Sequence, residues 1–334
     1  MARRRRSNKK TRANPNMPRK TVKKYRRFER LMSRFIQQMF KDLQTGLDRV
    51  LVPRIDLLAG NFKQEPKTVH IIANPITKEP EVITDDDANS PVGMELSKAI
   101  DLVEAQFLGL YSPAFIASNL RDFFKALDVQ VDVDSVREFT RQNIKVFPVG
   151  TDDIINNSVE TSLGKIKDLQ ASTIGLIRAE VTSGLVRGQR WETIAKRITR
   201  SMTAKPAKGE TPTPLAKASN RAKFIARNEV GTALGTINKE RQLAANVRLY
   251  TWQTTEDERV RGRGNRRFKE GQGDHRKLNG NIYSWEGTVV VDGTTYEMAD
   301  DNVFKDTMPG EPYNCRCVAI PYIPEFEEEN DDDN

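Results

Sequence analysis

The chain has 334 residues, a net charge of +8 and a hydrophobic fraction of only 37%. This composition favours an elongated or multi-part protein over one large globule. The sequence has no run of 18 apolar residues, so no membrane span is predicted, and its basic start lacks the apolar core of a secretory signal. The two cysteines, one residue apart, exclude a disulfide framework and fit a reducing cytoplasm.

The charge is concentrated at the two ends of the chain. Residues 1–30 carry fourteen Lys and Arg against one acidic residue, and residues 325–334 carry seven acidic residues and no basic one. Residues 1–20 cannot form a core and are predicted to be a disordered basic arm. This excess of positive charge indicates that the arm binds phosphates without sequence preference, rather than serving only as a solubilising tail. Its partner could be RNA, DNA or an acidic protein. The candidate phosphate-binding residues are Arg3, Arg4, Arg5, Arg6, Lys9, Lys10 and Arg12.

Residues 21–202 are predicted to be mainly helical. Apolar residues recur at steps of three and four from position 21 to about 50, and Pro53 is expected to end that helix. A short strand is expected near residues 69–72, where His70 lies in an apolar run and is interpreted as structural. Further helices are predicted at 93–108, 113–127, 134–146, 151–169, 172–187 and 191–202. Asp132 or Asp134 is the candidate N-cap of the helix at 134–146.

Residues 203–215 are rich in Pro, Gly and Lys and are predicted to be a linker. One long helix follows at 216–247, with Ala226, Val230 and Leu234 on one side and Asn228 and Glu229 mostly on others. Strands are expected at 249–252, at 289–291 and 294–298 around an Asp-Gly turn, and at 318–323, where the proline at 321 indicates an edge strand. The acidic residues 324–334 form a tail.

The predicted fold class is therefore mostly α in the N-terminal two thirds and α+β in the C-terminal domain. That domain, residues 216–323, is expected to place a long helix against a small, mainly antiparallel sheet.

Four short segments of this domain carry its motif. They are IARNEV at 225–230, the W…T..DERVR segment at 252–261, HRKLNG at 275–280 and PGEPYNCRC at 309–317. No single segment is specific, but the four in this order resemble the head-morphogenesis (Mu F-like minor head protein) family of tailed bacteriophages. The match covers about the last third of the chain, and the helical region from about 139 to 200 is similar to what precedes that domain in the family.

The resemblance implies a minor capsid protein of a tailed phage or prophage, without enzymatic activity. It implies assembly in the host cytoplasm, a place inside the virion near the portal vertex and several copies per particle. Some relatives leave the head with the genome, and the sequence leaves ejection open for this chain. The implied partners are the portal protein, other head proteins and packaged double-stranded DNA. The alternative is a particle-delivered effector or nuclease-like enzyme, although such relatives usually carry a further domain after the Cys-x-Cys strand, and only 17 residues follow Cys317 here. A non-phage nucleic-acid-binding protein is a third class, which the motif does not favour.

The polar residues that match the family motif suggest a metal site as one interpretation. They are Glu229, Asp257, Arg259, Arg261, His275, Asn314, Cys315, Arg316 and Cys317. In some relatives the DERV-like segment is followed by a Cys-x-x-Cys pair, which with the final Cys-x-Cys would give a four-thiolate zinc site. This chain departs from that pattern, because Arg261 stands where the first of those cysteines would be and His275 stands near the second. The remaining zinc ligands are His275, Cys315 and Cys317, with Asp257 as the candidate fourth.

Two other interpretations of the same residues remain open. In a buried polar network, Asp257 or Glu229 accepts a bidentate hydrogen bond from Arg259 or Arg316, and the cysteines are small buried hydrophobic residues. In a catalytic site, a Cys–His pair supplies the nucleophile, but no motif adds an orienting group. The spacer at 262–274 is predicted to be an exposed basic loop, either solvated or in contact with DNA.

Overall fold

The computed structural model describes residues 20–61, 69–73, 80–84, 91–186, 214–255, 260–262 and 273–324. None of the helices in these ranges contains a stretch with the length and hydrophobicity of a transmembrane segment. The predicted basic arm, the linker at 203–215, the acidic tail and the helix at 191–202 lie almost wholly outside the described residues. The domain boundaries therefore stay predictions.

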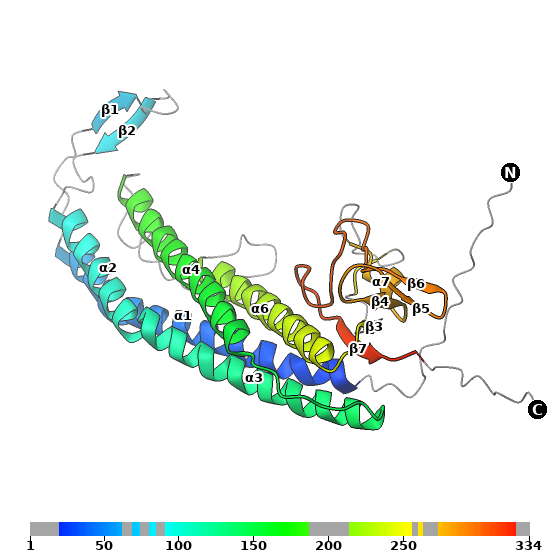
Figure 1. Ribbon diagram of the computed structural model, residues 1–334. Coiled ribbons are helices and arrows are strands. Elements are labelled where there is room, and N and C mark those ends of the chain that lie inside the picture. Colours follow the sequence, from blue (N-terminus) through cyan, green and yellow to red (C-terminus); the bar gives the residue numbers. More distant parts are fainter. Residues whose placement is uncertain are drawn as a thin grey trace, which may run out of the picture. The chain divides into compact units, whose positions relative to one another are not determined.

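The chain folds into two compact units, each built from stretches that are distant in sequence. Of the described residues, one unit takes those within Met1–Arg30, Arg121–Val159 and Ala226–Asn334, and the other takes those within Leu31–Leu120 and Glu160–Ile225. Because the boundaries fall inside helices, four of the long helices contribute residues to both units. The long helices are α1 (Lys20–Asn61), α2 (Pro91–Leu110), α3 (Pro113–Arg141), α4 (Asp152–Val186) and α6 (Pro214–Ala244), as Figure 1 shows.

The unit that contains α2 is a helical core with one small hairpin. Side chains from α1, α2 and α4 are buried together in it, among them Leu43, Leu47, Val103 and Ile177. Arg178 of α4 bridges two carboxylates of α2, Asp101 at 2.7 Å and Glu104 at 2.5 Å. Strands β1 (Val69–Ala73) and β2 (Pro80–Thr84) pair antiparallel, which confirms the short strand predicted near residues 69–72.

Three predicted helix ends are wrong. Helix α1 continues through Pro53 to Asn61; the local cost of an internal proline, about 3 kcal/mol, is small beside the packing of a 42-residue helix. Helix α4 is unbroken near residue 170, because the hydroxyls of Ser172 and Thr173 donate to the carbonyl oxygen of Leu169 and so are satisfied within the helix.

The third wrong end concerns α3, which runs through Asp132 and Asp134 without a break. Neither aspartate caps a helix, because both have partners on other helices. Asp132 pairs with Arg241 of α6, and Asp134 accepts from Lys24 Nζ at 2.8 Å and from Tyr25 Oη at 3.1 Å. Ion pairing between helices thus replaces the local capping that the sequence suggested.

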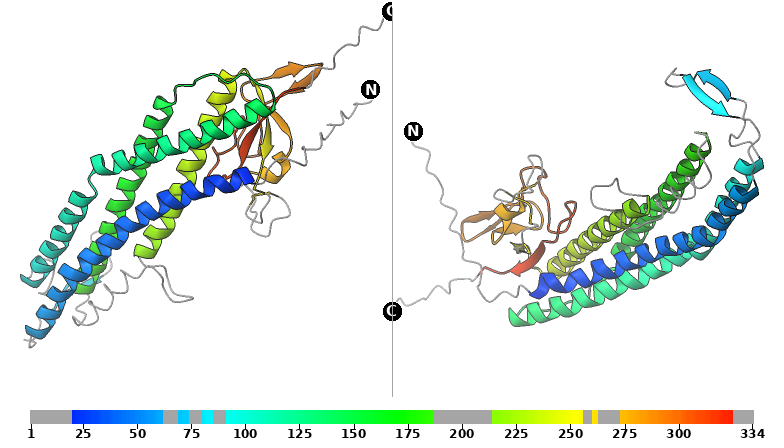
Figure 2. Two further views of the ribbon diagram at one scale, coloured as in Figure 1. Left: turned by 90° about the horizontal axis from the view of Figure 1, so that it is seen from below. Right: turned by 180° about the vertical axis from the view of Figure 1, so that it is seen from behind.

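The C-terminal residues form the expected small sheet beside α6. Strand β3 (Leu249–Gln253) lies between β4 (Ile282–Ser284) and β7 (Val318–Tyr322), and both pairings are antiparallel (Figures 1 and 2). Strands β5 (Val289–Val291) and β6 (Thr294–Tyr296) form a hairpin. Asp292 and Gly293 at its turn have φ of 49° and 71°, the positive values that a two-residue hairpin loop requires. The predicted fold class, including β7 as an edge strand, is confirmed.

The sheet packs around one compact core that includes the two cysteines. Its buried members are Tyr250, Trp252, Leu278, Trp285, Ala299, Cys315, Cys317 and Ala319. The indole Nε1 of Trp285 donates to Gln242 Oε1 of α6 at 2.9 Å, so the core is joined to the helix by a buried hydrogen bond as well as by apolar contact.

Candidate functional site

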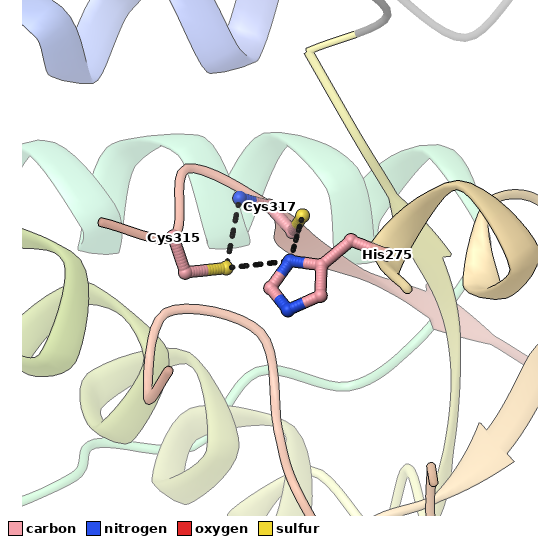
Figure 3. Close-up of side chains that lie close together, drawn as sticks. All are labelled: His275, Cys315 and Cys317. Atoms are coloured by element: carbon pink, nitrogen blue, oxygen red, sulfur yellow. Dashed lines mark hydrogen bonds between the residues drawn. The ribbon is translucent and has the colours of Figure 1, made fainter. Parts of the chain in front are cut away.

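Three motif residues from two segments meet inside this core. His275 is the first residue of the short helix α7 (His275–Leu278), and Asp274 caps that helix by accepting from the backbone N–H of Lys277. Cys315 and Cys317 lie just before β7. The Nδ1 atom of His275 is 3.6 Å from Cys315 Sγ and 3.5 Å from Cys317 Sγ (Figure 3). All three side chains are buried, with exposed fractions of 2%, 3% and 5%.

The other ring nitrogen of His275 faces two charged groups. Asp301 Oδ2 lies 3.3 Å from Nε2, and Arg261 Nη2 lies 3.1 Å from the same atom. Asp301 is fully buried; its Oδ1 accepts from the backbone N–H groups of Val303 and Phe304, but its Oδ2 has no well-directed hydrogen bond among the described residues. Oδ1 of Asp301 therefore stabilises the backbone turn at Val303 and Phe304, while Oδ2 points toward the imidazole of His275.

The two thiols differ in acidity. Burial opposes ionisation of Cys315, but its hydrogen bonds with Cys317 and His275 outweigh burial and hold its pKa well below the usual value. Burial and the neighbouring Cys315 raise the pKa of Cys317 well above the usual value. The backbone N–H groups of Gly310 and Cys317 both donate to Cys315 Sγ at 3.4 Å. Cys315 is thus the thiol that ionises first, and its sulfur already accepts hydrogen bonds.

The loop that carries the cysteines lies directly on α6. Gly231 and Gly235 stand one helical turn apart, and Gly310 of the loop has φ of 96°. A Cβ atom on Gly235 would come within 2.2 Å of the carbonyl oxygen of Pro309, and one on Gly310 within 2.1 Å of that of Gly231. Only glycine allows this backbone approach. The backbone of α6 and the Pro-Gly segment of the motif can therefore pack in direct contact because glycines occupy the contact positions.

A second polar network surrounds the same loop on its outer side. Arg316, between the two cysteines, donates from Nε and Nη2 to the carboxylate of Glu29 on α1, at 2.7 to 3.0 Å. The backbone N–H of Asn314 donates to Asn228 Oδ1 at 2.8 Å, and Arg227 Nη1 donates to Asn314 Oδ1 at 2.7 Å. The loop is thus tied to α6 and to the first turns of α1.

The structure brings only part of the predicted set together. His275, Cys315, Cys317 and Arg261 form one cluster, whereas Asn314 and Arg316 belong to the outer network. Glu229 and Asn228 are both buried on α6, although the sequence predicts that they lie mostly away from its apolar side. The loop at 309–317 covers Asn228, whose Oδ1 accepts from the backbone N–H of Asn314. Asp257, Arg259 and most of the spacer at 262–274 lie outside the described residues, as do the seven arm residues, so their predicted roles stay predictions.

Two residues of the site were not anticipated from the sequence. Asp301 lies 26 positions from His275 in a loop without periodicity, and Glu29 lies 287 positions from Arg316. No local pattern signals either pairing. The glycines at 231 and 235 do carry a signal, since glycine is unfavourable inside a helix and often has a packing reason there, such as a close backbone approach.

The described residues thus define a helical protein that ends in a small α+β domain, with a buried Cys-x-Cys–His cluster at the junction of helix, loop and sheet. Residues 176–320 match the family model described as Phage Mu protein F like protein. The resemblance to the Mu F-like family is confirmed over those residues, and with it a connection to bacteriophage head morphogenesis. Neither the curated proteins nor the solved structures contain a match.

Proposed function

We propose that the chain is a minor capsid protein of a tailed phage or prophage that sits near the portal vertex inside the head and contacts packaged DNA. The family match over residues 176–320 carries the proposal, because that family is a structural head-morphogenesis family. The proposed partners are the portal protein, other head proteins and double-stranded DNA. Assembly takes place in the host cytoplasm, and the protein leaves the head with the genome.

The basic arm supports the DNA contact independently of the family. Residues 2–20 contain nine Lys and Arg and no acidic residue. Each phosphate that such a segment neutralises releases condensed counterions, which gives affinity without sequence preference. Packaged DNA is a dense polyanion, so an arm of this composition suits the inside of a head.

The enzymatic alternative has less support. The only described Cys–His pair is buried, with exposed fractions of 5% or less, and a nucleophile needs access to its substrate. The arrangement of His275 between two thiols is better suited to holding the fold together than to attacking a bound molecule.

The DNA contact is tested by a salt titration of full-length protein on duplexes of unrelated sequence. If the arm meets six or more phosphates, binding should weaken by roughly 10³–10⁵ between 50 and 200 mM salt and should not depend on the sequence. A variant with Arg3, Arg4, Arg5, Arg6, Lys9, Lys10 and Arg12 all changed to Gln keeps the arm's length and should bind weakly with a flatter salt slope. Unchanged binding by this variant would show that the arm is not the DNA element.

Incorporation into procapsids separates the arm from the rest of the protein. The Gln-substituted variant should enter procapsids in normal amounts, because the proposal assigns protein contacts to the helices and the C-terminal domain. Quantifying the protein in particles produced with each variant measures this directly. Loss of both DNA binding and incorporation would make the arm an assembly signal and would contradict this division of roles.

A further inference from the structure

We propose that His275, Cys315 and Cys317 bind one zinc ion through Nδ1 and the two Sγ atoms, and that Asp301 fixes the imidazole for this purpose. The inference goes beyond the proposed function, because none of the proposed contacts with the portal, other head proteins or DNA involves a metal. The proposed ligand set is particular to this chain, because Arg261 occupies the position at which a four-thiolate site would have a cysteine.

The spacing of the donor atoms suits the ion. Tetrahedral zinc with Zn–S near 2.3 Å and Zn–N near 2.0–2.1 Å places nitrogen and sulfur ligands about 3.5 Å apart. The observed distances from His275 Nδ1 to the two sulfurs are 3.6 and 3.5 Å, and the candidate donor atoms of the three residues all lie within 4.8 Å of one another. An N–H···S hydrogen bond has a similar length, so these distances alone do not distinguish a zinc site from a hydrogen bond. The residues that contact the other ring nitrogen of His275 and the two sulfurs provide the distinction.

The first of these groups is Asp301. A ligand histidine that binds metal through Nδ1 carries its proton on Nε2 and donates it to a carboxylate or carbonyl, which fixes the ring. Asp301 Oδ2 is that acceptor: it is buried, 3.3 Å from Nε2, and otherwise without a hydrogen bond among the described residues. A buried carboxylate oxygen without a donor is costly, and the metal-bound tautomer supplies the donor.

The second group is Arg261, which favours the opposite tautomer. If its guanidinium donates to Nε2 across 3.1 Å, the ring proton sits on Nδ1 and that nitrogen cannot bind a cation. Asp301 and Arg261 therefore compete for the same ring nitrogen, one for and one against metal binding. This competition makes the proposal testable with two substitutions of opposite effect.

On the sulfur side, hydrogen-bond donors point at Cys315 Sγ. The backbone N–H groups of Gly310 and Cys317 donate to Cys315. Burial and Cys315 raise the pKa of Cys317, but a thiol that coordinates a metal is deprotonated by the ion itself. The buried indole Nε1 of Trp252 has no hydrogen-bond partner among the described residues. Two thiolates and one Zn²⁺ sum to zero charge, which suits a buried site. No fourth His, Cys, Asp or Glu among the described residues joins the group, and zinc with three protein ligands takes a water molecule in the remaining position.

The direct test is metal analysis of the purified full-length protein, followed by replacement with Co²⁺. We expect about one zinc per chain, and a cobalt form with the visible bands of a tetrahedral ion and a sulfur-to-cobalt charge-transfer band. Cys317→Ser should roughly halve that band, and His275→Ala should weaken binding, whereas His70→Ala changes the other histidine and should leave both metals in place. Wild-type protein that contains almost no zinc and takes up none when Zn²⁺ is added would overturn the proposal.

The competing neighbours provide the sharper test. Asp301→Asn keeps an oxygen for Val303 and Phe304 but loses the carboxylate beside Nε2, so zinc affinity should fall about 10- to 100-fold. Arg261→Met should leave the affinity unchanged or raise it. Circular dichroism and melting in the presence of a chelator show whether each variant is folded. If Arg261→Met abolishes binding while Asp301→Asn does not affect it, Arg261 orients the ring and the assignment of Asp301 is wrong.

Discussion

Gly235 lowers the helix propensity of α6 but allows the loop at 309–317 to pack closely against that helix. A glycine inside a helix is about 1 kcal/mol less favourable than alanine, and Gly235 lies well inside α6. In return, α6 and the loop at Pro309 and Gly310 approach to backbone contact. Without that approach, the segment from 309 to 317 could not hold Cys315 against His275 in its present position.

Gly235→Ala should therefore destabilise the protein although it improves helix propensity. The added Cβ would lie 2.2 Å from the carbonyl oxygen of Pro309, and forced overpacking costs about 1–3 kcal/mol. Urea unfolding of the full-length chain measures the difference.

Gly164→Ala is the matched control for this substitution. Gly164 lies in α4, and outside that helix no atom of the described residues would lie within 4 Å of an added Cβ, so alanine should stabilise the protein by up to about 1 kcal/mol. If the two variants shift stability in the same direction, the close packing of the loop on α6 is wrong.

At the scale of the elements, the Cys-x-Cys loop connects α1 to the C-terminal sheet. The first turns of α1 pack on α3 through the rings of Phe28 and Phe123, 5.7 Å apart, and are bound to the loop by the bidentate pair of Glu29 and Arg316. Both charged side chains are largely buried, with 14% and 16% exposed. Two N–H···O bonds between ionised groups in such surroundings are stronger than a surface ion pair.

Glu29→Gln should loosen the start of α1. The amide is similar in shape but neutral, so Arg316 loses its charged acceptor, and the expected loss of stability is about 1.5–3 kcal/mol. Faster hydrogen exchange at the α1 amides near position 29, with unchanged exchange in β3, checks this.

Glu286→Gln serves as the control for Glu29→Gln. Glu286 pairs with Lys239 at 3.1 Å, but its side chain is 61% exposed, so the substitution should change stability by no more than about 1 kcal/mol. Equal effects of the two substitutions would mean that the Glu29 pair behaves as an ordinary surface contact.

The elements also show what the sequence can and cannot predict. Periodicity located α1 and α6, and the Asp-Gly turn located the β5–β6 hairpin, because these signals are local. The predicted breaks at Pro53 and at Asp132 failed because long-range packing and the pairing of Asp132 with Arg241 outweigh local preferences. In the site, the motif identified His275, Cys315 and Cys317, whereas Asp301 and Glu29 reach it only through the tertiary fold.

On the scale of the whole molecule, the family match leaves the charged ends unexplained. It spans residues 176–320, whereas the basic arm ends at residue 20 and the seven acidic residues begin at 325. Both charged ends therefore lie outside the matched region. Opposite charges on two ends of one chain attract each other, and the attraction is screened by salt over about 10 Å at 0.1 M.

We therefore expect the acidic tail to compete with DNA for the basic arm. Changing the seven acidic residues of 325–334 to Asn or Gln raises the net charge from +8 to +15 and should strengthen DNA binding on the order of tenfold at low salt, with little effect at high salt. The decisive measurement is a double-mutant cycle with the Gln-substituted arm. If the tail acts through the arm, neutralising the tail should change DNA binding little once the arm is neutral. An equal gain in both backgrounds would mean that the tail repels DNA directly, and no change in either would leave the tail without a part in DNA binding.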